Sequence, residues 1–202
     1  MEESVLIAFL TASVLLTLSP GPDILYVFSL SLSAKKKDAI KLTWGLTTGL
    51  FLHTAVVALG WSEVLLRFPE LVWSIKIIGA SYLVYLAVSA LRQKPTTEVS
   101  EPTKTKSYFW QGFLMNVTNP KVTLFFMVFF PGFVFSETLS LQTQFGVLGL
   151  LFWGQAFLIF NGVALLGDRI QKYSYFSLTQ RFQNRLQAFV LLCIAVVLLM
   201  SA

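Results

Sequence analysis

The stretch LTLSPGPDILY, residues 16–26, decides the fold, because two prolines flank a glycine there and an aspartate follows. It interrupts a run of Leu, Val, Ile, Phe and Ala that extends from Val5 to Leu32. Proline lacks a backbone N–H and clashes with the preceding helical turn, so a helix over this run must break at residues 20–22. The break also places a carboxylate, Asp23, in the middle of an apolar segment.

The composition indicates a membrane protein. Of 202 residues, 55% are hydrophobic and only 12% are charged, whereas a soluble domain carries about 25% charged residues. The net charge of +5 does not indicate a nucleic-acid partner, because the cations lie between apolar runs and no basic stripe alternates with aromatic residues. The single cysteine, Cys193, excludes an internal disulfide. The opening Met-Glu-Glu-Ser has no positive charge, which disfavours a signal peptide.

Six apolar runs are long enough to cross a bilayer, which requires roughly 20 residues. They predict an all-α integral membrane fold with six transmembrane helices, at about 5–33, 39–60, 68–91, 108–135, 141–166 and 183–201.

The positive charges predict the orientation of these helices. Three alternate joints hold four cations each: Lys35, Lys36, Lys37 and Lys41; Arg92, Lys94, Lys104 and Lys106; Arg169, Lys172, Arg181 and Arg185. Because cytoplasmic loops are enriched in Lys and Arg, these joints are predicted to face the cytoplasm. Both termini then lie outside, and residues 92–107 form a cytoplasmic loop.

A second break, Asn116 to Lys121, interrupts the fourth run. Each broken run is the first of three, and an odd number of spans inverts the second unit relative to the first. Paired breaks in two halves are typical of inverted-repeat transporters. The predicted organisation is therefore repeat 1 at 1–91, the loop at 92–107 and repeat 2 at 108–202.

Broken backbone within a bilayer persists only where it is buried in protein or lines a wet cavity. The half-helices that start at the breaks expose N–H groups and a positive dipole end, which suit a carboxylate. A simple proline kink without a ligand is the alternative. The candidate substrate-binding residues are Pro20, Gly21, Pro22, Asp23, Asn116, Asn119, Pro120 and Lys121.

Two charged residues belong to these breaks. A carboxylate at mid-membrane costs roughly 3 kcal/mol or more, so Asp23 should face the protein interior, where it could hold an ammonium group or carry a proton. Its alternative role is to cap the second half-helix. Lys121 lies ~20 Å from the start of its span at 1.5 Å per residue, which is deep for a lysine that extends to the surface.

His53 is the only histidine, and it follows Gly45 and Gly49 at intervals of four residues. This spacing puts all three on one helix face, where the glycines admit a close neighbouring helix. His53 is either a second proton-coupling candidate after Asp23 or a buried structural residue. No cluster of Cys, His and carboxylates indicates a metal site.

Several segments together resemble a known family. Three segments resemble, in order along the chain, the signatures of the lysine exporter (LysE/RhtB-type) amino-acid efflux family: LSPGPDILYVFSLSLSAKKKDAIKLTWGLTTGLFLHT, IKIIGASYLVYLAVSALR and GFLMNVTNPKVTLFFMVFFPGFV. The joint SAKKKDAI departs from the pattern, because it lacks the usual glycine and arginines. The resemblance implies proton-driven export of amino acids or related metabolites across a bacterial inner membrane.

These observations predict a secondary-active exporter that works by proton antiport. A passive channel or a metal-ion efflux protein of similar fold are the alternatives. An enzyme is disfavoured, because the single His and single Cys lie on different spans. The expected partners are an amino-acid substrate, protons and lipid, with no cofactor and no nucleic acid. A homodimer is left open.

Overall fold

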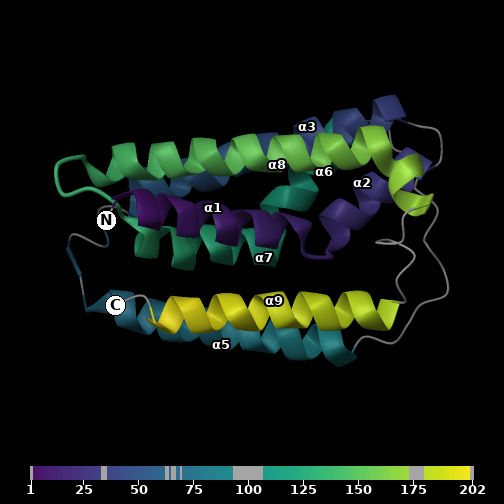
Figure 1. Cartoon of the computed structure of the whole chain (residues 1–202). Coiled ribbons are helices and arrows are strands. Elements are labelled where there is room, and N and C mark those ends of the chain that lie inside the picture. The colour runs from purple at the N-terminus through teal and green to yellow at the C-terminus, as the bar shows by residue number, and fades with distance from the viewer. Residues whose placement is uncertain are drawn as a thin grey trace.

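The computed structural model describes residues 2–32, 36–61, 64, 67–68, 70–92, 107–172 and 180–200 (Figure 1). Within these ranges all regular structure is helical, and no strand occurs. The predicted cytoplasmic loop, residues 92–107, lies outside the described residues except at its two ends. The helices are α1 Glu2–Leu18, α2 Pro22–Leu32, α3 Lys36–Val56, η1 Val57–Trp61, α5 Leu71–Arg92, α6 Tyr108–Val117, α7 Pro120–Leu124, η2 Phe125–Phe129, η3 Phe130–Phe133, α8 Leu141–Lys172 and α9 Gln180–Met200.

The helix lengths confirm the all-α membrane class in its coarse form. Two helices in the described ranges, Lys36–Gly60 and Leu141–Gly167, are long and apolar enough to cross a membrane. Two bent pairs bring the number to four if each pair is one span: α1 with α2, and α6 with the segment Pro120–Phe133. The six-span inverted repeat stays a prediction.

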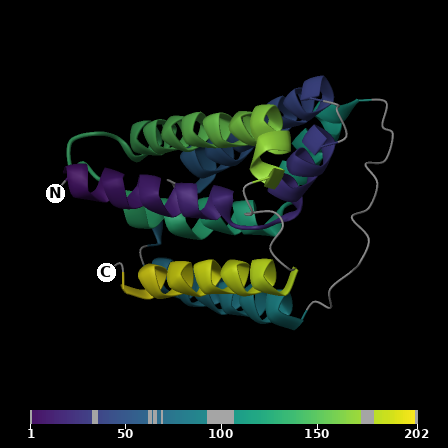
Figure 2. The same ribbon diagram turned by 45° about the vertical axis from the view of Figure 1, so that its right-hand side comes forward.

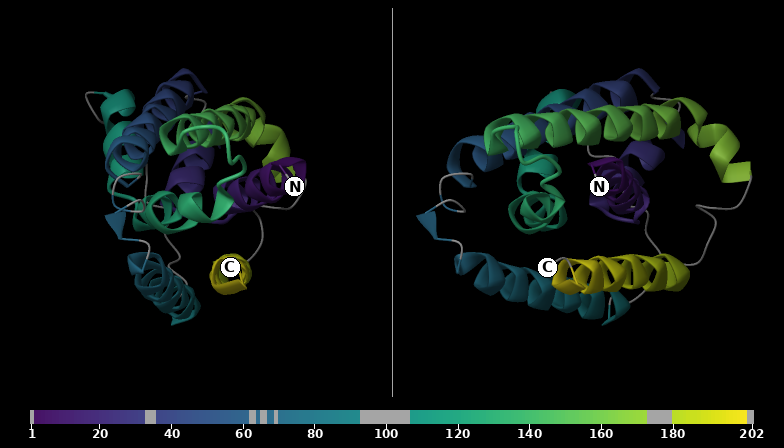
Figure 3. Two further views of the ribbon diagram at one scale, coloured as in Figure 1. Left: turned by 90° about the vertical axis from the view of Figure 1, so that its left-hand side faces the viewer. Right: turned by 60° about the vertical axis from the view of Figure 1, so that its left-hand side comes forward.

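The helices pack as a main group with a helix pair at one side. α8 packs against α1, α2 and α3, and α3 packs against α6. α5 pairs with α9, and this pair lies beside the main group in every view (Figures 1, 2 and 3). The two broken segments are thus held within the main group, packed against α3 and α8.

Glycines allow the closest of these contacts. A Cβ at Gly45 of α3 would collide with the backbone carbonyl of Phe109 on α6, and a Cβ at Gly112 of α6 would collide with the carbonyl of Leu42. A Cβ at Gly49 would lie 2.6 Å from Oδ1 of Asn116. Small residues at these positions let the two backbones touch, which is how helices associate tightly in lipid.

Phenylalanines fill the space between α1, α8 and the segment that follows the second break. Phe126 stacks on Phe130 with ring centroids 4.3 Å apart, and Phe9 meets the edge of Phe130 at 5.3 Å. We call these residues the phenylalanine cluster: Phe9, Phe125, Phe126, Phe129, Phe130, Phe133, Phe145 and Phe152, each at most 7% exposed. Tight ring packing of this kind excludes water.

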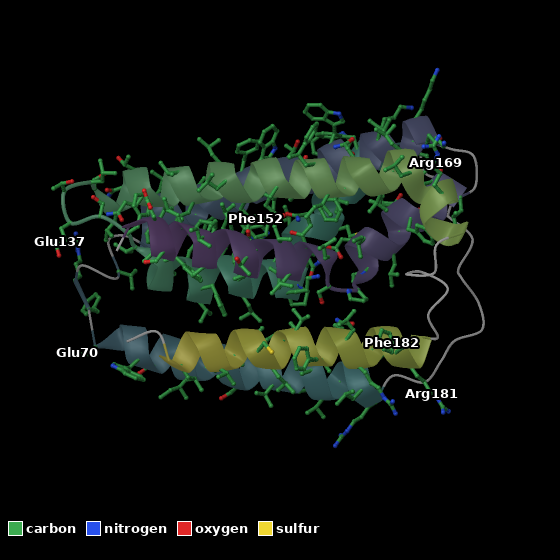
Figure 4. The ribbon with its side chains drawn as sticks, viewed as in Figure 1. Glu70, Glu137, Phe152, Arg169, Arg181 and Phe182 are labelled. Carbon is green, nitrogen blue, oxygen red and sulfur yellow. The ribbon has the colours of Figure 1, made fainter. Side chains whose placement is uncertain are left out.

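The two ends of the bundle differ in charge. Glu70 and Glu137 lie at the end where α1 begins and α9 finishes, whereas Arg169 and Arg181 lie at the opposite end (Figure 4). Phe152 lies between these ends, roughly midway along α8 (Figure 4). The chain therefore begins and finishes at the less basic end.

Candidate functional site

The first break bends the chain by 56° between α1 and α2. In a continuous helix the Ser19 carbonyl would accept the N–H of Asp23, four residues on. At the bend this carbonyl instead accepts a hydrogen bond from Nζ of Lys121, at 3.1 Å. The backbone group that the first break frees is therefore satisfied by a side chain from the second break.

The second break bends the chain by 48° between α6 and the segment that starts at Pro120. Asn119 is the N-cap of α7, and its Oδ1 accepts the Lys121 N–H at 3.0 Å. Pro120 takes the first helical position, where a missing N–H costs nothing. The sequence Asn-Pro-Lys thus ends one helix and starts the next without an outside partner.

Asp23 and Lys121 are brought together by these two breaks. Asp23 is 2% exposed and Lys121 is 5% exposed. A methyl group on Gly21 would lie 2.8 Å from Oδ1 of Asp23 and 3.3 Å from Nζ of Lys121. Both charged groups therefore lie against Gly21, which leaves them room only because it has no side chain.

A small cavity lies beside these groups. Its volume is about 10 Å³, which is room for about one water molecule. Its lining combines residues of both breaks with apolar residues: Leu16, Thr17, Asp23, Leu50, Asn116, Lys121, Val122, Phe152 and Phe160. A solute larger than water requires the surrounding helices to move apart.

Several buried polar atoms around the breaks have no hydrogen-bond partner. Among the described residues these atoms are Oγ of Ser19, Oδ1 of Asp23, Oδ1 of Asn116, Nδ2 of Asn119 and Oε1 of Gln155. A buried polar atom without a partner costs about 1–3 kcal/mol, so such atoms are rare and mark places where a ligand can bind. Four of the five belong to the two breaks.

His53 lies behind the site rather than in its wall. It is 6% exposed, its ring stacks on Phe126 with centroids 5.3 Å apart, and its Nε2 lies 3.4 Å from the Asn116 carbonyl. It does not line the cavity. A proton on His53 would therefore reach the cavity only through neighbouring groups such as Asn116.

The predicted residues divide by position. Asp23, Asn116 and Lys121 line the cavity, whereas the backbone-shaping residues and the cap do not: Pro20, Gly21, Pro22, Asn119 and Pro120. Gly45 and Gly49 lie at the contact between α3 and α6, and Gly49 abuts Asn116.

Sequence reasoning did not identify several residues of the cavity wall: Leu16, Thr17, Leu50, Val122, Phe152 and Phe160. Thr17 stands two residues before the first break, which is a weak signal. Its hydroxyl donates to the Ser13 carbonyl at 2.9 Å and accepts from Nε2 of Gln155 at 3.0 Å. The apolar residues carry no signal, since they resemble every other residue of their spans.

A metal site finds no support in this geometry. Within the described residues, no three of His, Cys, Asp and Glu lie close enough together to hold an ion.

Comparison with known proteins identifies the family. The sequence profile of the LysE type translocators matches residues 14–202. The chain belongs to the LysE family. This match confirms the resemblance to the lysine exporter family. Because members of the family are translocators, it also confirms the prediction that the chain is not an enzyme.

Two of the relatives that match the chain are named as efflux proteins. A homoserine/homoserine lactone efflux protein of Salmonella typhimurium is 31% identical over 170 residues, which cover 81% of this chain and 80% of the relative. A threonine efflux protein of Escherichia coli is 28% identical over 156 residues, or 72% of this chain and 75% of the relative. A membrane protein of Vibrio cholerae is 28% identical over 176 residues, or 86% of this chain and 85% of the relative. No solved structure matches the chain significantly.

Proposed function

We propose that this protein is a secondary-active exporter of neutral amino acids or related small metabolites across the bacterial inner membrane, driven by proton antiport. One observation carries the proposal: a small cavity lies where two broken helices meet, with one buried carboxylate and one buried ammonium group in its wall. A zwitterion complements this pair of charges.

The unpaired atoms match the two ends of an amino acid. Oδ1 of Asp23 and Oδ1 of Asn116 are free acceptors for a substrate ammonium. Lys121 lines the cavity and has further N–H groups for a carboxylate beside the one that binds the Ser19 carbonyl. The unpaired Nδ2 of Asn119 does not line the cavity, so it becomes a donor to the substrate only when the surrounding helices move. A dibasic substrate would add a second cation, for which the cavity wall offers no second acid. The relatives named for homoserine and threonine efflux agree with a substrate whose side chain is neutral.

The packing is consistent with six spans in two inverted repeats. α3 and α8 are the second helices of the two predicted units, and α1 and α6 begin their first helices. An exchange of the two units therefore turns the contact of α3 with α6 into the contact of α8 with α1, and both contacts occur. The contact of α5 with α9, the third helices, turns into itself. An approximate twofold axis relates such units in inverted-repeat transporters. Rocking of one unit against the other would expose the cavity to each side in turn.

The orientation follows from charge. The end with Arg169 and Arg181 faces the cytoplasm by the positive-inside rule, so both termini lie outside (Figure 4). Asp23 is our first candidate for the proton-coupling group, because it lines the cavity with an unpaired oxygen. His53 is the second candidate.

The test is efflux from proteoliposomes loaded with labelled homoserine, threonine or lysine, with and without an acidic outer buffer. We expect the pH gradient to accelerate release of homoserine or threonine, and to accelerate lysine release little. Asp23→Asn should abolish the acceleration, whereas Asp38→Asn should not, because Asp38 pairs with Lys41 at the surface. Unselective release that ignores the gradient would establish a channel instead, and coupled flux in Asp23→Asn would refute the role of Asp23.

A further inference from the structure

The wall of the cavity has two unlike parts. Asp23, Asn116 and Lys121 come from the two broken segments, and they supply both charged groups and the one amide of the wall. α8 contributes two phenylalanines, Phe152 and Phe160. If the charged ends of a zwitterion bind at the breaks, its side chain points away from them, and the aromatic residues of α8 are available to receive it.

The two phenylalanines are spaced along one face of α8. They stand eight residues apart, which is ~12 Å along a helix axis, and Ala156 stands between them on the same face. All three are buried, with Phe152 and Phe160 each 3% exposed and Ala156 fully covered. This face therefore presents two rings with a single small side chain between them.

The two rings are held differently. Phe152 belongs to the phenylalanine cluster, with ring centroids 5.2 Å from both Phe125 and Phe126. Phe160 pairs with no aromatic ring in the part of the chain that the structure describes. The ring of Phe152 is thus held in place by its aromatic neighbours, whereas no neighbouring ring among the described residues holds Phe160.

We propose that Phe152, Ala156 and Phe160 form the subsite for the substrate's side chain and set the upper limit of its length. This proposal rests on the proposed function, since it assumes that an amino acid binds at the breaks. The small side chain of Ala156 leaves room for a short, uncharged substrate side chain once the helices move apart, and the rings exclude longer ones. A charged side chain is excluded as well, because the subsite has no group to pair with it.

The experiment measures chain-length selectivity. Proteoliposomes are loaded with labelled L-homoserine together with one unlabelled competitor from the series L-2-aminobutyrate, L-norvaline and L-norleucine, and competitor release is expressed relative to homoserine release. Because this ratio is taken within one sample, it does not depend on how much protein folds. The wild-type ratio is expected to fall steeply at one point in the series, which we call the length limit.

Two substitutions should move the length limit in opposite directions. Phe160→Leu enlarges the subsite, so the first competitor beyond the limit should gain about tenfold in relative release. Ala156→Val reduces it, so the last accepted competitor should lose about tenfold. The controls are Phe145→Leu and Ala164→Val, which make the same changes at buried positions of α8 outside the segment bounded by the two cavity-lining rings, and both should keep the wild-type limit.

The outcomes separate this proposal from the function on which it rests. Homoserine release by the wild type, with a length limit that Phe160→Leu and Ala156→Val leave in place, would refute the subsite and leave the exporter intact. Equal shifts in the variants and their controls would also refute it. No gradient-dependent release of homoserine or of any member of the series by the wild type would refute both.

Discussion

The two breaks solve the same backbone problem in different ways. The second break supplies its own partner, because the Asn119 side chain caps α7 through the Lys121 N–H. The first break depends on its counterpart, because the Ser19 carbonyl is satisfied by Nζ of Lys121. One lysine therefore serves both breaks, with its backbone in one and its side chain in the other. A change at Lys121 should therefore affect both breaks, whereas a change at the Asn119 cap should affect the second break alone.

The strongest test of this asymmetry is Lys121→Met. The substitution leaves the Asp23 carboxylate buried without a cation and the Ser19 carbonyl without a donor, which should destabilise the protein by about 3–5 kcal/mol and abolish transport. Thermal unfolding in detergent and proteoliposome efflux measure the two effects.

The matched comparison is the double variant Asp23→Asn with Lys121→Met. Removal of both charges should recover much of the lost stability, since no unpaired charge remains buried, but transport should stay absent. If the double variant is as unstable as Lys121→Met alone, the two charges do not stabilise each other.

Gly21→Ala should have the next largest effect. The added methyl group would press on Oδ1 of Asp23 and Nζ of Lys121, and such overpacking costs about 1–3 kcal/mol. Because flexible side-chain ends can move away, we expect the loss mainly in substrate affinity, by roughly tenfold. The half-saturating substrate concentration for efflux measures it, with Gly154→Ala as the control, since a methyl group there meets nothing within 4 Å. An equal loss in both variants would contradict the role given to Gly21.

Asn119→Ala tests whether the second break is self-sufficient. Loss of the cap on the Lys121 N–H should destabilise the protein by about 1 kcal/mol. Asn119→Asp keeps an acceptor oxygen at this position and should retain most of the capping energy, although it adds a buried negative charge beside Lys121. A melting temperature unchanged by Asn119→Ala would show that the break does not need its cap.

Ser19→Ala should have the smallest effect, within about 0.5 kcal/mol of the wild type. At this position the backbone carbonyl makes the contact across the breaks, and the side-chain Oγ has no partner. A stability loss as large as that of Asn119→Ala would mean that the two breaks use side-chain caps equally, against the difference described above.

The breaks were predictable because their cause is local. Pro20, Pro22 and Pro120 interrupt a helix wherever it lies, and the glycines that precede His53 at helical spacing mark a face that admits a close neighbour. The partner of that face was not predictable. A pattern on α3 cannot name α6, because contact between two helices depends on how every other helix in the bundle packs.

The sequence by itself determined the membrane class, the two interruptions, the charges beside them and the family. These features follow from backbone chemistry and from the cost of a charge in hydrocarbon, which a single segment already expresses. Only the tertiary structure decided that Lys121 reaches the Ser19 carbonyl, that His53 lies behind the cavity, and that Phe152 and Phe160 complete its wall. The physical reason is that the phenylalanines of α8 are chemically alike along the chain, and packing alone selects the two that face the breaks.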